Sequence, residues 1–377
     1  MKVMTILGTR PEIIRLSRVI PILDEHAEHV LVHTGQNYDD RLSRLFFDEL
    51  SVRAPDEHLG IRADSAGEQI GTILQRCEEM LVRYRPDRLL ILGDTNSGLS
   101  AIIARRLGVP VYHMEAGNRC YDDRVPEEVN RRVIDHSSTV LMPYTNRSRE
   151  NLLREGIAGE RIYVTGNPIR EVMEVYSTQT KGSRVLETLG LRPRGYFLVT
   201  MHRAENVDDE LRLRDLVAAM ERLAQNWSFP VICSFHPRTR AKVNTFGVDV
   251  TRAGLRFVEP FGFFDFVRLE QEAFCILSDS GTVQEEACIL GVPNVTIRDV
   301  TERPETIECG SNILSGAEPE EVFRAVSFVT RRPAEWGPPA EYMAEHVSDT
   351  VARIVLGFRI PDAAEIMWRQ ARRGSVG

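Results

Sequence analysis

A chain of 377 residues is long enough for two globular domains, since domains usually comprise roughly 100–200 residues. Hydrophobic residues make up 42% of the chain and charged residues 27%, as in ordinary globular proteins with large buried cores. Lysine and arginine number 47 against 55 aspartates and glutamates, so the formal net charge is −8. This balance argues against a protein that coats nucleic acid or an anionic membrane, so any bound anion must be held by a local site.

The cysteines do not form a pattern typical of metal binding or of a disulfide framework. Six are spread along the chain without a Cys-x-x-Cys pair or a short Cys/His cluster: Cys77, Cys120, Cys233, Cys275, Cys288 and Cys309. We therefore expect no metal site and a reducing compartment. The apolar run at residues 3–7 is too short for a signal peptide, and no stretch approaches the ~18 apolar residues of a membrane span. The sequence predicts a cytoplasmic protein with no nucleic-acid or membrane partner.

In the first half of the chain, short apolar runs alternate with longer helical patterns, which is typical of βαβ units around a parallel sheet. Expected strands cover residues 3–7, 30–33, 89–92, 109–113, 140–142 and 162–164. Expected helices include residues 11–24, 68–84 and 98–107, the last of which ends at Gly108.

Residues 177–183 are polar and are predicted to form an interdomain linker. The alternation resumes with expected strands at residues 197–201, 231–235, 257–258, 275–277 and 292–297. The sequence therefore predicts an α/β protein with two Rossmann-like, doubly wound domains, residues 1–176 and 177–357. A tail of helical character, residues 358–377, is expected to pack back on the N-terminal domain.

Ligands of such sheets bind beyond the carboxyl ends of the strands, so polar residues that follow the expected strands are candidate site residues. After the first strand, residues 8–12 combine a glycine, a helix start and Arg10, which suits a phosphate. An ordinary strand–helix turn is the alternative. The segment contains neither a dinucleotide fingerprint nor a P-loop, so we expect no nicotinamide cofactor.

Carboxylates follow two further strands of the first half. Asp94 and Glu115 each come directly after an expected strand, while Glu127 lies four residues before Arg131 on one helix face. Taken singly, Asp94 is compatible with a helix cap, and Glu127 with Arg131 is compatible with a surface ion pair.

The second half carries polar groups at the corresponding positions. His202 and His236 end successive strands, and each is followed by an arginine. Residues 260–266 are rich in aromatic side chains, which fit a core corner or stacking on a base. Residues 278–286 open a helix with small hydroxyl residues and a glycine, a start that can accept a diphosphate, and Glu286 follows one turn later, where it can accept hydrogen bonds from ribose hydroxyls. Together these positions predict a cleft whose second-domain side binds a nucleoside diphosphate.

In these motifs the chain resembles the non-hydrolysing UDP-N-acetylglucosamine 2-epimerase family. The matching segments occur in order over nearly the whole chain: residues 8–12, 93–95, 115–117, 126–131, 202–203, 279–281, 284–286 and 298–305. The resemblance implies two Rossmann-like domains facing across a cleft in the GT-B arrangement, a homodimer, and no cofactor. It also implies a UDP-N-acetylhexosamine substrate and the conversion of UDP-N-acetylglucosamine into UDP-N-acetylmannosamine for polysaccharide biosynthesis.

The family pattern also assigns roles to residues of this chain. The resemblance implies four catalytic residues, Asp94, Glu115, Glu127 and His202. It implies that phosphates, ribose, uracil and sugar are contacted by Arg10, Arg15, Arg131, His236, Phe261, Phe266, Ser280, Gly281, Thr282, Glu286 and Arg303. Within this set, Phe261 and Phe266 would flank the uracil, and Arg10, His202 and Arg303 would serve the phosphates.

Several positions depart from the family pattern. The family's lysine is Arg15 here, and the second glycine after the diphosphate-binding serine is Thr282. The family's effector region has two glutamines three residues apart, whereas this chain has Gln36 and Asp39, so regulation by a second substrate molecule is not predicted. Residues 118–126 and 236–240 are more similar to the branch that acts on modified UDP-sugars such as 2,3-diacetamido-glucuronate or 6-deoxy-talosamine derivatives, which is the alternative substrate class.

The expected chemistry is an elimination, because no adjacent carbonyl acidifies the C2 proton of an N-acetylhexosamine. Loss of UDP across C1 and C2 leaves a 2-acetamidoglycal, to which UDP re-adds while a proton returns to the other face of C2. Cationic groups would stabilise the leaving diphosphate, and two of the three carboxylates would act as base and acid. A GT-B glycosyltransferase, a hydrolysing relative that releases N-acetylmannosamine, and a non-catalytic nucleotide-sugar sensor are the competing functions.

Overall fold

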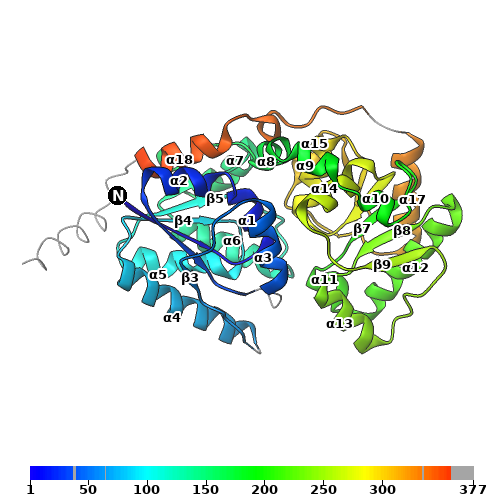
Figure 1. Cartoon of the computed structure of the whole chain (residues 1–377), viewed down its shortest axis with the longest axis horizontal. Helices are drawn as coiled ribbons and strands as arrows, with labels where there is room; N and C mark the ends of the chain where they lie inside the picture. The colour runs from blue at the N-terminus through cyan, green and yellow to red at the C-terminus, as the bar shows by residue number, and fades with distance from the viewer. Residues whose placement is uncertain (37–39, 64, 333–334, 358–377) are drawn as a thin grey trace, which may run out of the picture. The chain divides into compact units, whose positions relative to one another are not determined.

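The structure is a computed structural model of the chain and describes residues 1–36, 40–63, 65–332 and 335–357. Two compact units form the molecule (Figure 1). The first comprises Met1–Val172 and the C-terminal segment that begins at Ala344, and the second comprises Met173–Met343. Asp39 and the predicted tail, residues 358–377, lie outside the described residues.

The first unit is built on a six-stranded parallel sheet with the strand order β3-β2-β1-β4-β5-β6. Its strands are β1 (Lys2–Leu7), β2 (Glu28–His33), β3 (Glu57–His58), β4 (Arg88–Leu92), β5 (Val111–Met114) and β6 (Val140–Met142). Its helices are α1 (Arg10–Leu16), α2 (Val19–His26), α3 (Asp40–Glu49), α4 (Ala66–Tyr84), η1 (Asn96–Leu99), α5 (Ser100–Arg106), α6 (Pro126–Ser137), α7 (Asn146–Arg154), η2 (Gly159–Arg161), α8 (Ile169–Val175) and α18 (Val347–Gly357). Helix α8 ends just beyond the boundary between the units.

The second unit repeats this architecture with the strand order β12-β11-β10-β7-β8-β9, again parallel throughout. Its strands are β7 (Phe197–Thr200), β8 (Val231–Ser234), β9 (Leu255–Val258), β10 (Cys275–Ser278), β11 (Asn294–Thr296) and β12 (Asn312–Leu314). Its helices are α9 (Ser177–Gly182), α10 (Val185–Thr188), α11 (Ala204–Val207), α12 (Glu210–Trp227), α13 (Pro237–Phe246), α14 (Phe263–Glu272), α15 (Gly281–Leu290), α16 (Pro304–Glu308), α17 (Pro319–Arg331) and η3 (Ala340–Met343).

Each sheet is covered by helices on both faces, which is why its strands are apolar without alternation. In β7, Phe197 and Val199 pack into one apolar cluster, whereas Leu198 packs into a second cluster on the opposite face. In the first unit, α4 and α5 lie on one side of the sheet and α2 and α18 on the other (Figure 1). The predicted α/β fold with two doubly wound Rossmann-like domains is confirmed.

Several segments differ from the expectations at the level of individual elements, among them β12, which no predicted strand covers. Residues 177–183, predicted as a linker, form α9 instead, because Thr180 is buried and the helix packs on α14. The strand expected at residues 162–164 is reduced to an isolated bridge between Leu141 and Ile162. Strand β3 was not predicted, because it is only two residues long and contains no apolar run.

The C-terminal helix α18 belongs to the first unit, although the sequence analysis places residues up to 357 in the second domain. Its buried residues Val351 and Val355 lie on the face that packs against α2. The guanidinium of Arg88, at the start of β4, donates a hydrogen bond to the Val355 carbonyl, and the Ser348 N–H donates to Glu171 at 2.9 Å. The chain therefore returns to the first unit at about residue 344 rather than at residue 358.

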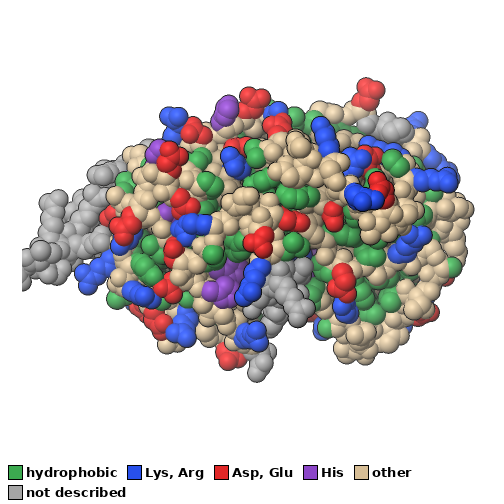
Figure 2. Space-filling view, viewed as in Figure 1, with side chains coloured by type: hydrophobic (Ala, Val, Ile, Leu, Met, Phe, Trp, Pro, Cys, Tyr) green, Lys and Arg blue, Asp and Glu red, His purple; other side chains and the backbone are tan. Residues whose placement is uncertain are grey.

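The surface carries both signs of charge. On the face shown in Figure 2, Lys and Arg side chains alternate with Asp and Glu side chains, and hydrophobic side chains occur singly or in small groups. Within the described residues, no helix combines the length and the apolar composition needed to cross a membrane.

Candidate active site

The turn after β1 packs tightly against the neighbouring strand ends. A side chain at Gly8 would place its Cβ 2.1 Å from the Thr34 hydroxyl and 2.4 Å from the Ser97 hydroxyl, so only glycine fits. Arg10 follows as the first residue of α1, and its guanidinium lies 5.9 Å from the centre of the Phe46 ring. Arg10 therefore lies at a helix start at the carboxyl edge of the sheet. This is the position from which the sequence analysis predicts a phosphate contact.

Glu12 ties this turn to the end of β4. Its carboxyl group accepts hydrogen bonds from the Gly8 N–H at 3.0 Å, the Thr9 hydroxyl at 2.7 Å and the Thr95 hydroxyl at 3.2 Å. Burial raises the pKa of Glu12 from 4.5 to about 7, because the ionised form loses hydration, and the hydrogen bonds offset only part of this. The sequence analysis missed this role, since Glu12 was seen only as part of a turn motif.

Glu115 and Arg15 form a buried ion pair. Their side chains are 7% and 2% exposed, and the guanidinium also lies over the Tyr144 ring at 5.5 Å. Glu115 follows β5 directly and has a φ of 64°, a left-handed conformation that is uncommon for a residue with a side chain and that occurs often at functional sites. Arg15, predicted to bind substrate, thus holds one of the predicted catalytic carboxylates.

Asp94 is held by Arg131. The Nη2 and Nε atoms of Arg131 lie 2.7 and 2.8 Å from the Asp94 Oδ2 atom, and its Nη1 atom lies 2.7 Å from Glu128. The spacing in the sequence is compatible with an ion pair between Glu127 and Arg131, and the structure shows ion pairs of Arg131 with Asp94 and Glu128. Glu127 lies half-buried in the first turn of α6.

A buried network of hydrogen bonds and an ion pair holds the ends of β4 and β5, next to Asp94 and Glu115. The His113 ring bridges the Gly93 carbonyl at 2.8 Å and the Asp135 carboxylate at 2.9 Å. Asp135 also pairs with Arg119 at 2.8 Å. Burial alone would raise the pKa of Asp135, but the bonds and charges of His113 and Arg119 outweigh burial and hold the pKa below its ordinary value. Because Leu92 pairs with Met114 across these strands, the loops that carry Asp94 and Glu115 start from neighbouring positions.

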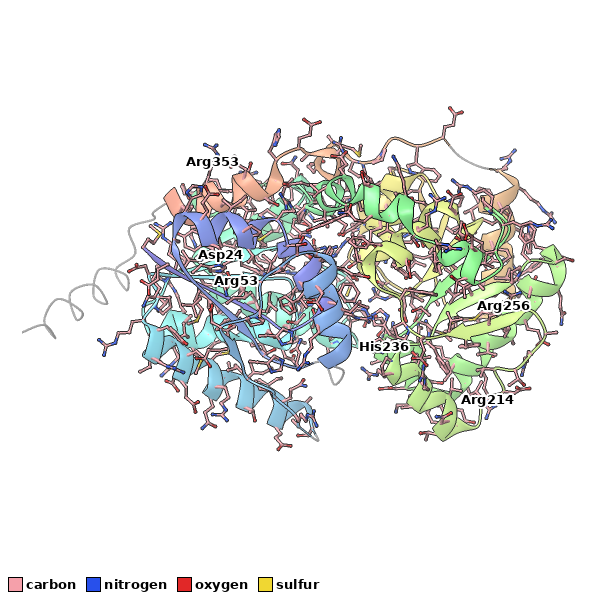
Figure 3. The ribbon with its side chains drawn as sticks, in the orientation of Figure 1. Asp24, Arg53, Arg214, His236, Arg256 and Arg353 are labelled. Carbon is pink, nitrogen blue, oxygen red and sulfur yellow. The ribbon has the colours of Figure 1, made fainter. Side chains whose placement is uncertain are left out.

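In the second unit, Asp279 orients His202. The Nδ1 atom of His202 lies 3.0 Å from Asp279, and the other carboxylate oxygen accepts from the backbone N–H groups of His202 at 2.8 Å and Arg203 at 2.9 Å. Burial would raise the pKa of Asp279, but the charge and hydrogen bonds of His202 outweigh burial and hold the pKa well below its ordinary value. The His202 side chain is 35% exposed, and its ring lies 5.4 Å from that of His236, which is labelled in Figure 3. A ring held at Nδ1 presents its Nε2 edge outward, which suits a hydrogen bond to a phosphate.

Helix α15 begins at the carboxyl end of β10, as the diphosphate prediction requires. Ser280 is the residue that precedes the helix, its side chain makes no capping hydrogen bond, and Gly281 is the first helical residue. A side chain at Gly281 would place its Cβ 2.6 Å from a Glu302 carboxylate oxygen. Thr282 follows and is half-buried. Nearby, the buried Arg303 guanidinium pairs with the Glu285 carboxylate. The helix start therefore offers backbone N–H groups beside a guanidinium.

Glu286 lies one turn into α15 and is 3% exposed, with the Glu270 carboxyl group of α14 beside it. Burial and the Glu286 charge hold the pKa of Glu270 well above its ordinary value. Among the described residues, no hydrogen-bond donor reaches either Glu270 oxygen. Phe261 and Phe266 are half-buried and pack against the apolar cluster of this region. The sequence analysis missed Glu270, because an acid on a core-facing helix position has no local signal.

The structure thus gathers the predicted residues at the carboxyl edges of two sheets, one cluster in each unit. The first cluster contains Arg10, Arg15, Asp94, Glu115, Glu127 and Arg131, and the second contains His202, His236, Ser280, Gly281, Thr282, Glu286 and Arg303. Within the part of the chain that the structure describes, no three His, Cys, Asp or Glu side chains converge as a metal site would require.

Two parallel-sheet units with such strand-end clusters define a nucleotide-binding α/β protein, and comparisons with known proteins identify its family. A sequence profile of UDP-N-acetylglucosamine 2-epimerases matches residues 22–356, and the chain belongs to this family. It is 40% identical to the UDP-N-acetylglucosamine 2-epimerase of Methanocaldococcus jannaschii, a match that covers 90% of this chain and 95% of the relative. It is also 37% identical to the UDP-2,3-diacetamido-2,3-dideoxy-D-glucuronate 2-epimerase of Pseudomonas aeruginosa, covering 84% and 89%.

Solved structures agree with this assignment. The crystal structure of the Methanocaldococcus jannaschii UDP-GlcNAc 2-epimerase in complex with UDP-GlcNAc and UDP matches with a TM-score of 0.90 and 38% identity over 94% of this chain and 99% of that one. The structure of the UDP-N-acetylglucosamine 2-epimerase from Rickettsia bellii matches with a TM-score of 0.87 and 40% identity over 99% of both chains. The family predicted from the motifs is confirmed.

Proposed function

We propose that this chain is a non-hydrolysing 2-epimerase that interconverts UDP-N-acetylglucosamine and UDP-N-acetylmannosamine. The observation that carries the proposal is the pair of carboxylates at neighbouring strand ends, Asp94 and Glu115, each held by a buried arginine in a chain of this family. A glycosyltransferase has no need of two such acids beside the donor sugar, whereas proton transfer on both faces of one carbon requires an acid and a base.

The reaction proceeds in two half-steps. In the first, a carboxylate removes the C2 proton, a double bond forms between C1 and C2, and the C1–O electrons leave with UDP. In the second, the same oxygen of UDP attacks C1 of the glycal, and the other acid delivers a proton to the opposite face of C2. Asp94, Glu115 and Glu127 are the candidates for these two roles.

The arginines of the first unit orient the acids. Arg15 pairs with Glu115 and Arg131 pairs with Asp94, so each carboxylate is held in a defined position. Glu127, half-buried in the first turn of α6, is the third candidate for an acid or base role.

In the second unit, the residues around α15 suit UDP. The helix start at Gly281, with Arg303 and the Nε2 edge of His202, would stabilise the charge that develops on the leaving diphosphate. Ser280 and Thr282 would contact phosphate oxygens, and Glu286 would accept hydrogen bonds from ribose hydroxyls. By the family pattern, Arg10 would join the phosphate contacts, Phe261 and Phe266 would flank the uracil, and His236 would lie beside His202.

The substrate class has one alternative supported by an observation. The 37% identity to a UDP-2,3-diacetamido-glucuronate 2-epimerase favours a sugar with further substituents at C3 and C6. We further propose that the enzyme is a cytoplasmic homodimer that needs no added cofactor. Light scattering after size exclusion tests the dimer, and activity measured in the presence of EDTA tests the metal independence.

Proton NMR of purified enzyme with UDP-N-acetylglucosamine in D2O tests the proposal. We expect the UDP-sugar epimer to accumulate with deuterium at C2. Release of free N-acetylmannosamine would indicate a hydrolysing enzyme. A substrate that stays unchanged until an acceptor is added would indicate a glycosyltransferase. Epimer without deuterium at C2 would refute the elimination route, and a parallel reaction with the diacetamido-glucuronate nucleotide decides between the two sugars.

A further inference from the structure

The buried carboxylate of Glu128 joins two segments of the first unit, helix α6 and the loop that follows β5. The residue is fully buried in the first turn of α6. Its Oε2 atom accepts from Arg131 Nη1 at 2.7 Å and from the Cys120 N–H at 3.0 Å. Its Oε1 atom accepts from the Tyr121 N–H at 3.0 Å and from Arg132 Nη2 at 3.3 Å. The Glu128 side chain thus connects α6 to the loop that follows β5 and also binds the guanidinium of Arg131.

The guanidinium of Arg131 transmits the position of Glu128 to Asp94. Arg131 is 3% exposed and is gripped at both edges, with Nη1 on Glu128 and with Nη2 and Nε on Asp94 at 2.7 and 2.8 Å. A guanidinium is planar and its donors form a rigid fork, so the orientation of one edge fixes that of the other. Moving the Glu128 carboxylate therefore turns the donors that hold Asp94.

The loop contacts connect Glu128 to the second predicted catalytic acid. The loop starts at Glu115 and reaches Tyr121, which has a φ of 56°, a strained conformation that persists only when its surroundings hold it. The two backbone N–H groups that Glu128 accepts from lie at this point of the loop. Glu128 thus anchors the middle of the loop whose first residue is Glu115.

Capping of its own helix does not explain this arrangement. In a capping box the glutamate at the third helical position accepts from the N–H of the residue that precedes the helix. Here that residue is Val125, and its N–H donates instead to the Asp122 carbonyl at 3.1 Å. Burial would raise the pKa of Glu128, but the Cys120 N–H and the Arg131 guanidinium outweigh burial and hold the pKa below its ordinary value, so the side chain stays ionised.

We infer that Glu128 is a positioning residue for the epimerisation, which sets the orientation of Asp94 through Arg131 and that of the Glu115 loop through its backbone bonds. This inference rests on the proposed function. It assigns a role to Glu128, whereas the sequence analysis selected only its neighbour Glu127.

Glu128→Gln is the test. Both carboxylate oxygens of Glu128 accept hydrogen bonds, but an amide has only one acceptor oxygen. The NH2 group of the glutamine would therefore face N–H donors and lose the hydrogen bonds of one oxygen. Because displacement of a reacting group by about 1 Å can cost ~10²-fold, we expect kcat to fall by ~10²-fold while the dissociation constant of UDP is unchanged. Glu171→Gln is the matched control, since Glu171 also accepts a backbone N–H, from Ser348 at 2.9 Å, and belongs to neither cluster. It should keep the wild-type kcat.

A double-mutant cycle separates positioning from a general structural role. If Glu128 acts through Arg131 on Asp94, then Glu128→Gln should lower kcat much less in an Asp94→Asn background than alone. Independent, multiplying effects, or a Glu128→Gln enzyme with wild-type kcat, would overturn the inference. If Glu128→Gln does not fold, Glu128→Asp, which keeps the charge and shortens the reach, should bind UDP with a lowered kcat, and wild-type kcat in that variant overturns the inference as well. A wild-type protein that binds UDP but forms no epimer contradicts the proposed function instead, so the two failures are distinct.

Discussion

The pH dependence of stability should report the buried carboxyl group of Glu12. Its pKa is raised from 4.5 to about 7 by burial, and the donors that the structure gives it, from Gly8, Thr9 and Thr95, are all uncharged. In the unfolded chain the group regains its ordinary pKa, so the folded state binds the proton more tightly. The contribution of Glu12 to stability is therefore fully present below pH 4.5 and is lost as the pH rises through about 7.

The size of this effect follows from the pKa difference. Each change of one in pKa corresponds to about 1.36 kcal/mol, so the rise from 4.5 to about 7 corresponds to about 3 kcal/mol. In Glu12→Gln the amide does not titrate, and its oxygen can still accept from the Gly8 N–H. The free energy of unfolding of this variant, relative to the wild type, should therefore increase by about 3 kcal/mol between about pH 4 and pH 8.

Urea unfolding at several pH values measures this difference, and hydrogen exchange of the amides in β1 and α1 assigns it to the first unit. Thr95→Val is the companion variant. It removes a donor that favours the ionised form, so it should move the loss of stability to higher pH. A difference between Glu12→Gln and the wild type that does not vary with pH would refute the reasoning.

Further outcomes are expected elsewhere in the molecule. Asp94→Asn should lower kcat by ~10³-fold with UDP binding intact, as expected for loss of an acid or base, whereas Asp24→Asn, at an arginine-paired aspartate of the first unit labelled in Figure 3, should keep the wild-type kcat in the same NMR assay. Gly281→Ala should weaken UDP binding by about tenfold in calorimetry, because the new Cβ would lie 2.6 Å from a buried carboxylate oxygen. Diamide should cross-link Cys288 and Cys309, whose sulfur atoms lie 3.7 Å apart, and peptide mapping that finds both thiols unmodified would contradict this.

The fold was predictable because its signals are local. Strands buried on both faces are continuous apolar runs, as in β4 and β7, and each is followed by a glycine or polar turn. The linker prediction at residues 177–183 failed because polarity alone does not reveal that Thr180 is buried under α14.

The candidate site was predictable by position but not by pairing. Strand ends identify Asp94 and Glu115, yet their partners come from distant parts of the chain; Arg15 and Glu115 are 100 residues apart. Helical spacing allows an arginine to pair with an acid three or four residues before it, so the sequence does not distinguish Glu127 from Glu128 as the partner of Arg131. The structure shows the pair with Glu128, which is fully buried.

The return of the chain to the first unit makes the second unit an insertion within the first. During synthesis, the ribosome must complete all of Met173–Met343 before α18 emerges, so α2 lacks its contact with α18 until the second unit has been made. A product that stops before Ala344 would contain the twelve described strands of both sheets but would lack the helix that packs on α2, and incompletely packed apolar surface of this kind favours aggregation. The first unit can therefore complete its packing only after the whole of the second unit has been made.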